Sequence, residues 1–272
     1  MDEITDLPQL KERPADSHKG MFGKILIIGG QVGMIGAPAL TGMAALRSGA
    51  GLVRIAVIKS ILNTVAGYDP CYMTIPLCEN HGELAPEALD CILNACEEND
   101  VIAIGPGLGT GKGARRIVSA LIEQDIKLVI DADGLNCLAK DSKWFARRKA
   151  SIILTPHPGE MSRLWKTVFR SDPPARNEQA QTFAKETGCT VVLKGASTIV
   201  SGSEKYYVNN TGNPGMSTAG TGDVLTGMIT ALAGQGLNDF QAAQLGVYLH
   251  GLAGDFAAKK RGQISMTASD VL

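Results

Sequence analysis

The sequence has almost no net charge and no long apolar run. Its 26 Lys and Arg residues nearly balance 27 Asp and Glu residues, which leaves a formal net charge of −1 at pH 7. A chain this neutral has no field to steer a nucleic acid or to hold an anionic membrane. No stretch approaches the ~20 apolar residues that span a bilayer, and the acidic start of the chain lacks the apolar region of a signal peptide. We therefore expect a cytoplasmic protein with no nucleic-acid or membrane partner.

Disulfide and zinc patterns are also missing. The six cysteines form no C-x-x-C pair, and several fall in apolar segments, where a thiol behaves as a small hydrophobe. The four histidines do not combine with any cysteine at a zinc spacing. We expect the cysteines to be reduced core residues of a cytosolic protein, and we expect no metal site built by the protein. The cysteines are Cys71, Cys78, Cys91, Cys96, Cys137 and Cys189.

Three familiar motifs fail by one or two residues. A dinucleotide fingerprint G-x-G-x-x-G starting at Gly105 would need glycine at Thr110. A P-loop in the same region would need glycine at Pro106 and Ser or Thr at Gly113. The nucleophile motif G-x-S-x-G fails because Ala219 occupies its last position. A hydrolase triad therefore has no support, although the glycines of residues 105–109 still allow a ligand to approach the backbone closely.

The composition and the pattern of apolar runs point to an α/β protein. The 272 residues are 44% hydrophobic and include 32 glycines, which fits one large core with tight strand-to-helix turns. Short apolar runs predict strands at residues 24–28, 52–57, 71–77, 101–104, 127–131, 151–154 and 190–194. Helical spacing predicts helices at residues 37–48, 86–97, 112–124, 174–187, from about 221 onward, and 238–260. A further helix is predicted to begin after Glu160. This alternation predicts a mostly parallel sheet covered by helices on both faces.

The two ends of the chain differ from this pattern. Residues 1–20 are mostly polar, carry Pro8 and Pro14, and are predicted to form an extended lead-in to a single domain over residues 21–272. Residues 198–200 and 205–208 are predicted to pair with 190–194 as a small antiparallel edge. The last residues, from about Ala268, are predicted to begin another helix.

Residues that bear chemistry follow several of the predicted strands. Gly29-Gly30, residues 105–109 and the loop with His157 follow predicted strands, and Asp131 and Lys194 stand at the ends of two others. In an open parallel sheet, ligands bind at the carboxyl ends of the strands. We therefore expect five loops to share one rim and to form a binding site there.

The strongest candidate for chemistry is Asp223. It lies in the first turn of the helix predicted from Thr221, where free backbone N–H groups and the helix dipole favour an anion. The predicted anion hole comprises Ala219, Gly220, Thr221 and Gly222. A carboxylate beside an anion implies that it handles a proton or a metal, and the dipole predicts an ionised, weakly basic Asp223. The alternative is an ordinary helix start with an acid favoured by the dipole, and the shared rim favours catalysis.

The remaining candidates keep two interpretations each. His157, stiffened by flanking prolines, either contacts a ligand or is only a loop residue. Lys194 either faces a phosphate or is a solvated edge lysine. Asp131 and Asp133 either hold Mg²⁺ through water or cap the following turn. His250 is predicted to be a satisfied structural histidine within the long helix.

Taken together, the motifs resemble those of the NAD(P)H-hydrate dehydratases, members of the ribokinase-like superfamily. The resemblance extends from about His18 onward, with every motif in the family's order. The motifs are Gly29-Gly30, Gly36-Ala37, residues 44–53, residues 105–109, Asp131-Ala132-Asp133, residues 154–160, Lys194-Gly195 and Gly220-Thr221-Gly222-Asp223. The resemblance implies a three-layer α/β sandwich. It also implies a carbon–oxygen lyase that uses ADP or ATP, with Mg²⁺, to repair hydrated NADH or NADPH.

The family's site residues carry over to matching positions of this sequence. The hydrated dinucleotide would contact Ala37, Gly107, His157 and Asp223. The adenine nucleotide would contact Lys194, Gly195, Ala196, Ser197, Thr198 and Gly222. Asp223 would accept the proton of the ring hydroxyl as phosphoryl transfer converts that hydroxyl into a better leaving group.

Relatives also suggest a homotetramer, and many bacterial ones carry an epimerase domain ahead of this one. We favour ADP as the donor because the sequence shows no targeting segment. The nearest alternative is a ribokinase-like kinase for hydroxymethylpyrimidine or hydroxyethylthiazole, which would use the same Asp223 and anion loop. A nucleotide-sensing protein with a dead site is less consistent with intact Asp223 and Lys194.

Overall fold

A ten-stranded sheet runs through the whole molecule. The structure is a computed structural model that describes residues 1–272. The strand order is β1-β12-β11-β10-β9-β8-β7-β2-β3-β4. Neighbours from β4 to β10 are parallel, β10, β11 and β12 pair antiparallel, and β1 is parallel to β12. The strands are β1 (Asp2–Glu3), β2 (Lys24–Ile28), β3 (Leu52–Ile58), β4 (Met73–Leu77), β7 (Val101–Ile104), β8 (Lys127–Ile130), β9 (Ser151–Leu154), β10 (Thr190–Leu193), β11 (Ile199–Ser201) and β12 (Lys205–Val208).

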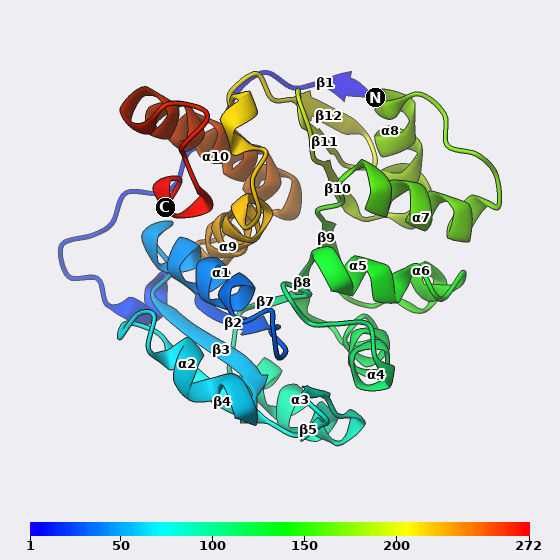
Figure 1. Cartoon of the computed structure of the whole chain (residues 1–272). Helices are drawn as coiled ribbons and strands as arrows, with labels where there is room; N and C mark the ends of the chain where they lie inside the picture. The colour runs from blue at the N-terminus through cyan, green and yellow to red at the C-terminus, as the bar shows by residue number, and fades with distance from the viewer.

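Helices cover both faces of this sheet. On one face α9 packs against β7, β2 and β8, and α1 and α10 pack against α9. The opposite face carries α4, α5, α7 and α8 (Figure 1). The helices are α1 (Gly36–Arg47), α2 (Leu62–Ala66), α3 (Leu89–Glu97), α4 (Lys112–Leu121), α5 (Ala132–Leu138), α6 (Trp144–Arg147), α7 (Pro158–Phe169), α8 (Arg176–Thr187), α9 (Thr221–Gly234) and α10 (Asp239–Arg261). This three-layer arrangement confirms the predicted fold class.

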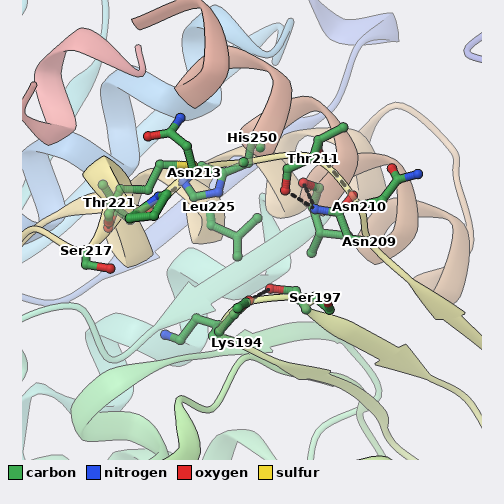
Figure 2. A pocket seen from close by; sticks show the side chains of 18 of the residues that line it. Lys194, Ser197, Asn209, Asn210, Thr211, Asn213, Ser217, Thr221, Leu225 and His250 are labelled. Atoms are coloured by element: carbon green, nitrogen blue, oxygen red, sulfur yellow. Dashed lines mark hydrogen bonds between the residues drawn. The ribbon is translucent and has the colours of Figure 1, made fainter. Parts of the chain in front are cut away.

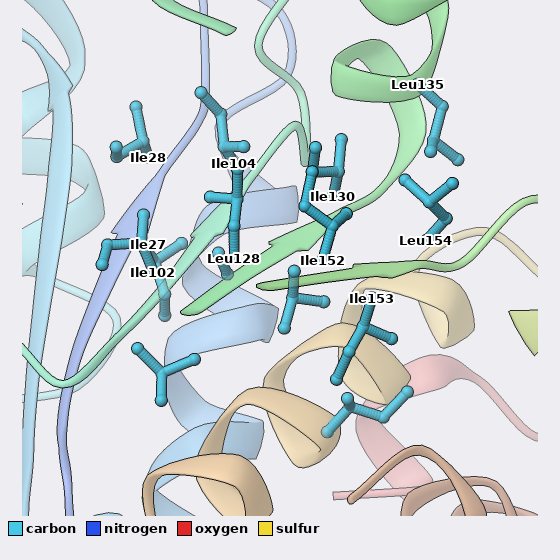
Figure 3. Packing of buried hydrophobic residues seen from close by; sticks show 14 of the residues in the cluster. Ile27, Ile28, Ile102, Ile104, Leu128, Ile130, Leu135, Ile152, Ile153 and Leu154 are labelled. Carbon is cyan, nitrogen blue, oxygen red and sulfur yellow. The ribbon is translucent and has the colours of Figure 1, made fainter. Parts of the chain in front are cut away.

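The central strands are apolar on both faces because helices bury both. Leu26, Ile102, Leu128 and Ile152 form one cross-strand row in register, and each is at most 1% exposed. Figure 3 shows these strands packed against the helical layers through branched aliphatic side chains. Continuous apolar runs of this kind are typical of buried parallel strands. The core therefore fixes where the carboxyl ends of β7, β8, β9 and β10 lie.

A second, smaller apolar cluster supports the start of α9. It joins α1, α9, α10 and the C-terminal turn through Ala44, Val224, Ala257, Met266, Ala268 and Val271. Val224 follows Asp223 directly and is 1% exposed. The first turn of α9 is thus anchored by packing, which holds the backbone around Asp223 in place.

The ends and the short elements differ from the sequence-based expectations. Asp2–Glu3 forms β1, and Gln244 Nε2 donates to the carbonyl of Asp6 at 2.9 Å, so residues 1–20 contact the domain. The helix expected from about Ala268 begins there, as a 3₁₀ helix over Ala268–Asp270. The sequence did not predict several short elements, because they are too short to show a hydrophobic period. Elements of this length are held by packing rather than by local propensity. They are α2, α5, α6 and the hairpin of β5 (Glu79–Asn80) and β6 (Glu83–Leu84).

The cysteine prediction is half wrong. All six cysteines are free, but only Cys96, Cys137 and Cys189 are buried. The other three are exposed, because they lie in a turn, at the end of β4 and on the outer side of α3.

A separate sequence expectation concerned membranes. None of the helices combines the length and the apolar character needed to cross a bilayer.

Candidate active site

The carboxyl ends of β8 and β10 meet the start of α9 through one buried carboxylate. Asp131 follows β8 and is 1% exposed. Its Oδ1 accepts a hydrogen bond from Lys194 Nζ at 2.7 Å, and its Oδ2 accepts one from Thr226 Oγ1 at 2.7 Å. Thr226 lies on α9 just after Asp223. Three elements that are far apart in the sequence are therefore joined at one point of the predicted rim.

A pocket of about 540 Å³ opens beside this junction. In Figure 2, Lys194 and Ser197 form one wall, and Thr221, Leu225 and His250 face them from the other. The lining includes all six residues to which the resemblance assigns the adenine nucleotide, namely Lys194, Gly195, Ala196, Ser197, Thr198 and Gly222. A volume in the range of roughly 300–1,000 Å³ is usual for small-molecule sites. The pocket therefore has the size to hold one nucleotide.

The far end of the pocket consists of residues that the sequence did not predict. It is formed after β12 by Asn209, Asn210 and Thr211. Asn209 is 4% exposed, and its Nδ2 donates to the carbonyls of Thr211 at 3.1 Å and Val247 at 3.2 Å. Its Oδ1 accepts from Thr211 Oγ1 at 3.1 Å. The only signal was a run of small polar residues after a strand, which is also how an ordinary loop looks.

The backbone at the start of α9 leaves a row of N–H groups unused. The N–H groups of residues 218–223 donate to no protein acceptor, and the first helical bond is from Val224 N to Gly220 O at 3.0 Å. The Thr221 hydroxyl donates to the carbonyls of Met216 and Thr218, each at 2.9 Å, which holds the preceding loop. Free amides at a helix N-terminus bind anions well. Residues 219–222, where an anion hole is expected, therefore have N–H groups that are free to donate.

Two glycines in this turn should respond differently to alanine. Gly220 has φ +94°, and a Cβ there would lie 2.7 Å from Leu40 Cδ1 and 2.9 Å from Ala268 Cβ. Gly220→Ala should therefore lower the free energy of unfolding by about 1–3 kcal/mol. Gly222 has a helical conformation, and a Cβ there meets only Lys194 Nζ at 3.3 Å and Asp131 at 3.8 Å, so Gly222→Ala should leave stability unchanged or raise it. Urea unfolding of both variants measures the difference, and equal stabilities would contradict it.

The electrostatics of Asp223 correct one expectation. Burial raises the pKa of Asp223 from its ordinary value of 3.8 to about 7, and the negative charge of Asp131 adds to this effect. The positive charge of Lys194 acts in the opposite direction, but it is outweighed. The expectation of a weakly basic carboxylate held ionised by the helix dipole was therefore wrong. A carboxylate with a pKa near 7 is well matched to accept a proton at neutral pH.

Lys194 is a partly buried cation, not a solvated edge lysine. Its side chain is 19% exposed and its ammonium is ion-paired with Asp131. Burial by itself lowers the pKa of Lys194, but the carboxylates of Asp131 and Glu160 outweigh burial and raise it. The ammonium therefore stays charged beside the pocket, where it can attract a phosphate.

Asp131 and Asp133 both make contacts within the protein, and the capping alternative is wrong for Asp131. Asp131 makes no side-chain cap bond to α5. Asp133 accepts from the backbone N–H of Gly109 at 2.9 Å and from Asn136 Nδ2 at 3.2 Å, so it holds the loop of residues 105–109. No group of three or more His, Cys, Asp or Glu side chains is placed to bind a metal. These carboxylates organise the rim.

His157 caps helix α7, a role that the sequence did not predict. Its Nδ1 accepts from the backbone N–H of Gly159 at 2.9 Å, and Glu160 accepts from the backbone N–H of His157 at 2.8 Å, which together cap α7. Burial lowers the pKa of His157, so the ring is neutral at pH 7. Burial raises the pKa of the nearby Glu160 to about 7. Half of the His157 side chain remains exposed and able to contact a ligand.

The residues expected to touch the dinucleotide lie outside the 540 Å³ pocket. None of Ala37, Gly107, His157 and Asp223 lines it. Ala37 and Gly107 lie against one another, since a Cβ at Gly107 would be 3.3 Å from Ala37 Cβ. The backbone carbonyl of Met34 covers the same point, 2.7 Å from that Cβ position. The expected nucleotide contacts therefore line the pocket, whereas the expected dinucleotide contacts lie outside it.

Comparison with known proteins places the chain in a family. A family model described as NAD(P)H-hydrate dehydratase matches residues 25–272. The chain belongs to the NAD(P)H-hydrate dehydratase family. It is 45% identical over 267 residues to the bifunctional NAD(P)H-hydrate repair enzyme Nnr of Moorella thermoacetica, covering 97% of this chain and 50% of that protein. It is 36% identical over 257 residues to the ADP-dependent (S)-NAD(P)H-hydrate dehydratase of Neisseria meningitidis, covering 93% of this chain and 83% of that protein.

Solved structures of this family show the same fold. The ADP/ATP-dependent NAD(P)H-hydrate dehydratase from Bacillus subtilis, co-crystallised with ATP and Mg²⁺, superposes with a TM-score of 0.81 at 28% identity. The match covers 96% of this chain and 90% of that one. A hydroxyethylthiazole kinase from Pyrococcus horikoshii superposes with a TM-score of 0.55 at 16% identity, covering 88% and 91%, and shares the fold alone. The chain spans about half the length of the bifunctional relatives that it matches.

Proposed function

We propose that this chain is an ADP-dependent (S)-NAD(P)H-hydrate dehydratase. The observation that carries the proposal is the position of Asp223, a carboxylate with a pKa of about 7 beside free N–H groups and next to the nucleotide pocket. Its basicity suits proton transfer from a substrate hydroxyl at neutral pH. The family and its ADP-dependent relative in Neisseria meningitidis support the choice of substrate and donor.

In this proposal Asp223 takes the proton of the ring hydroxyl of hydrated NADH or NADPH. The hydroxyl oxygen forms a bond to the terminal phosphorus of ADP, and the bond from that phosphorus to the bridging oxygen breaks, which releases AMP. The carbon–oxygen bond of the phosphorylated ring then breaks with loss of inorganic phosphate. A proton leaves the neighbouring carbon, and the dihydronicotinamide is restored. The net reaction is therefore the removal of water from the ring at the expense of one phosphoanhydride bond.

The other residues act by charge and position. The ammonium of Lys194 and the free N–H groups of residues 219–222 would stabilise the charge on the transferring phosphoryl group. Residues 194–198 and Gly222 would hold the nucleotide. Ala37, Gly107 and the neutral His157 would hold the dinucleotide on the adjacent surface.

Mg²⁺ would enter with the nucleotide. The chain offers no cluster of carboxylates as a metal cage, and the oxygens of Asp131 already accept hydrogen bonds from Lys194 and Thr226. Mg²⁺ is commonly bound by nucleotide phosphates and water with few protein ligands. It would neutralise phosphate charge there.

The decisive experiment is a repair assay. Purified protein is mixed with hydrated NADH, Mg²⁺ and either ADP or ATP. We expect near-ultraviolet absorbance to return together with stoichiometric phosphate release, and faster with ADP than with ATP. A parallel reaction with hydroxyethylthiazole or hydroxymethylpyrimidine and ATP should yield no phosphorylated product. Recovery of neither absorbance nor phosphate would overturn the proposal, and a phosphorylated vitamin precursor would favour the kinase alternative.

We also propose a cytoplasmic homotetramer, on the basis of the resemblance. Exposed apolar side chains are available for subunit contacts, among them Phe256 at 62% and Ile264 fully exposed. Light scattering of the purified chain should give about four times its mass of 28.6 kDa. A monomeric mass at micromolar concentration would contradict this assembly.

A further inference from the structure

The pocket segment of residues 194–198, hereafter the nucleotide loop, has a backbone that is unusual for its sequence. Gly195 has φ +139°, and Ser197, which is not glycine, has φ +55°. Positive φ values at residues other than glycine are uncommon, and they persist where the surroundings enforce them. Contacts from outside the loop are therefore needed to keep Lys194 and Ser197 in their positions along the pocket wall.

Arg176, the first residue of α8, supplies such contacts. Its Nη2 donates to the carbonyl of Leu193 at 2.9 Å, and its Nη1 donates to the carbonyl of Ala196. These two carbonyls flank Lys194 and Gly195, so one planar guanidinium bridges the bend of the loop. A guanidinium presents its donors on separate nitrogens in a rigid planar fork, so it suits two separate acceptors better than an ammonium, whose donors all lie on one nitrogen.

The fit of Arg176 against the loop is close. A Cβ at Gly195 would lie 2.9 Å from Arg176 Nη2, so the guanidinium occupies the space that a side chain would take. A further donor of the guanidinium, Arg176 Nε, is buried and has no partner. An unmade hydrogen bond at a buried group is unusual and needs an explanation. Here the guanidinium is oriented toward the two loop carbonyls, and Nε is left without an acceptor.

Arg176 does not line the pocket itself. It contacts the nucleotide loop from α8, whose side chains Gln179, Ala180 and Phe183 are buried against the sheet. An effect of Arg176 on a nucleotide would therefore pass through the loop backbone.

We propose that Arg176 is a positioning residue that sets the nucleotide loop in its binding conformation. This inference rests on the proposed nucleotide-dependent function of the same pocket. Without the guanidinium, the loop carbonyls would lose both donors and the left-handed residues would relax. Lys194 and the loop backbone would then be less well placed for the phosphates, and the affinity for ADP would fall.

The chain contains a matched control in Arg148. Its Nε donates to Thr187 O at 2.9 Å, its Nη1 to Ala150 O at 3.0 Å and its Nη2 to Gly188 O at 2.9 Å. Arg148 thus bridges backbone carbonyls just before β10 begins, whereas Arg176 bridges carbonyls just after β10 ends. Arg148 does not line the pocket. Loss of either arginine should cost comparable stability, but only Arg176 should affect the nucleotide.

The test compares Arg176→Met, Arg176→Lys and Arg148→Met. Calorimetric titration with ADP should show binding about 10- to 100-fold weaker in Arg176→Met, from the loss of two charge-assisted hydrogen bonds. Arg176→Lys should be intermediate, because it keeps the charge and at most one of the bonds. Arg148→Met should bind ADP within about twofold of the natural chain, the scatter expected for a distant site. In turnover assays the Arg176 variants should raise the KM for ADP and change kcat little.

Hydrogen exchange supplies a readout that does not depend on activity. The backbone amides of residues 194–198 should exchange faster in both Arg176 variants than in the natural chain. Their exchange rates should be unchanged in Arg148→Met. Binding of ADP by Arg176→Met as tight as by the natural chain would overturn the inference and leave the proposed function standing. If Arg176→Met fails to fold, unaltered binding and exchange in Arg176→Lys would overturn it in the same way. A natural chain that binds neither ADP nor ATP would overturn the proposed function and this inference together.

Discussion

Replacing Asp223 with asparagine should lower kcat for hydrate repair by about 10²- to 10⁴-fold, the usual contribution of a general base. Asparagine has nearly the same shape as aspartate but cannot accept the hydroxyl proton. The same substitution removes a negative charge near the expected position of the phosphates, so ADP should bind at least as tightly as before. Turnover by the repair assay and ADP affinity by calorimetry measure the two effects separately.

Asp223→Asn should also stabilise the fold, which separates lost chemistry from lost structure. The pKa of Asp223 rises from 3.8 to about 7 on folding, so the folded protein favours the protonated form. The free energy of unfolding therefore falls as pH rises from about 4 to about 7. Above pH 7 the buried charge of Asp223 lowers it by roughly 4 kcal/mol. Asparagine removes this cost. Thermal unfolding at pH 8 should show a higher Tm for the variant, and the difference should shrink toward pH 4.

Asp239→Asn provides the matched control. Asp239 is also an acid in the first turn of a long helix, but its carboxylate accepts a hydrogen bond from Ser151 at the amino end of β9, away from the pocket. Asp239→Asn should retain activity and should not gain stability, because it loses only a favourable helix-dipole interaction of about 0.3–1 kcal/mol. An Asp223→Asn variant that still turns over substrate would show that another group is the base.

The sequence alone was sufficient for the layers of the fold because its signals are local. Buried parallel strands such as Lys24–Ile28 are short apolar runs, and helices such as Asp239–Arg261 repeat their apolar positions at helical spacing. The order of strands and helices then implies that Asp131 and Lys194 lie at one edge of the sheet. Their meeting at 2.7 Å is a consequence of that topology.

The missed features depend on burial and on contacts between distant segments. The helix dipole is visible from the sequence around Asp223, but the burial that overrides it is a property of the packed molecule. His250 was expected to be structural. Its ring nitrogen Nε2 does lie 2.9 Å from the carbonyl of Thr221, but the residue also lines the pocket. Arg176 carried no signal at all, because its carbonyl partners, Leu193 and Ala196, are backbone groups that any sequence possesses.

The pH dependence of turnover should report the carboxyl cluster around Asp223. A base with a pKa of about 7 must be deprotonated, so kcat/KM should rise as pH increases through about 7 and then level off. Glu160 also has a pKa of about 7, so the rise of kcat/KM with pH, hereafter the acidic limb, could come from either group. The variant Glu160→Gln tests whether Glu160 causes this limb. Glutamine keeps the cap of α7 and removes the charge. We expect the limb to remain in Glu160→Gln, and its disappearance would assign it to Glu160 instead.

Asp131→Asn should then move this limb to lower pH. The charge of Asp131 raises the pKa of Asp223, and it also neutralises Lys194, whose own charge lowers that pKa. Asparagine removes the negative charge that raises the pKa of Asp223, and it leaves the positive charge of Lys194, which lowers that pKa, without its partner. Both changes lower the pKa of Asp223. A more acidic base is a weaker one, and the plateau of kcat should fall about tenfold or more. A limb that stays near pH 7 in Asp131→Asn would show that burial alone sets the basicity of Asp223, and that Asp131 serves only to hold Lys194 and Thr226 in place.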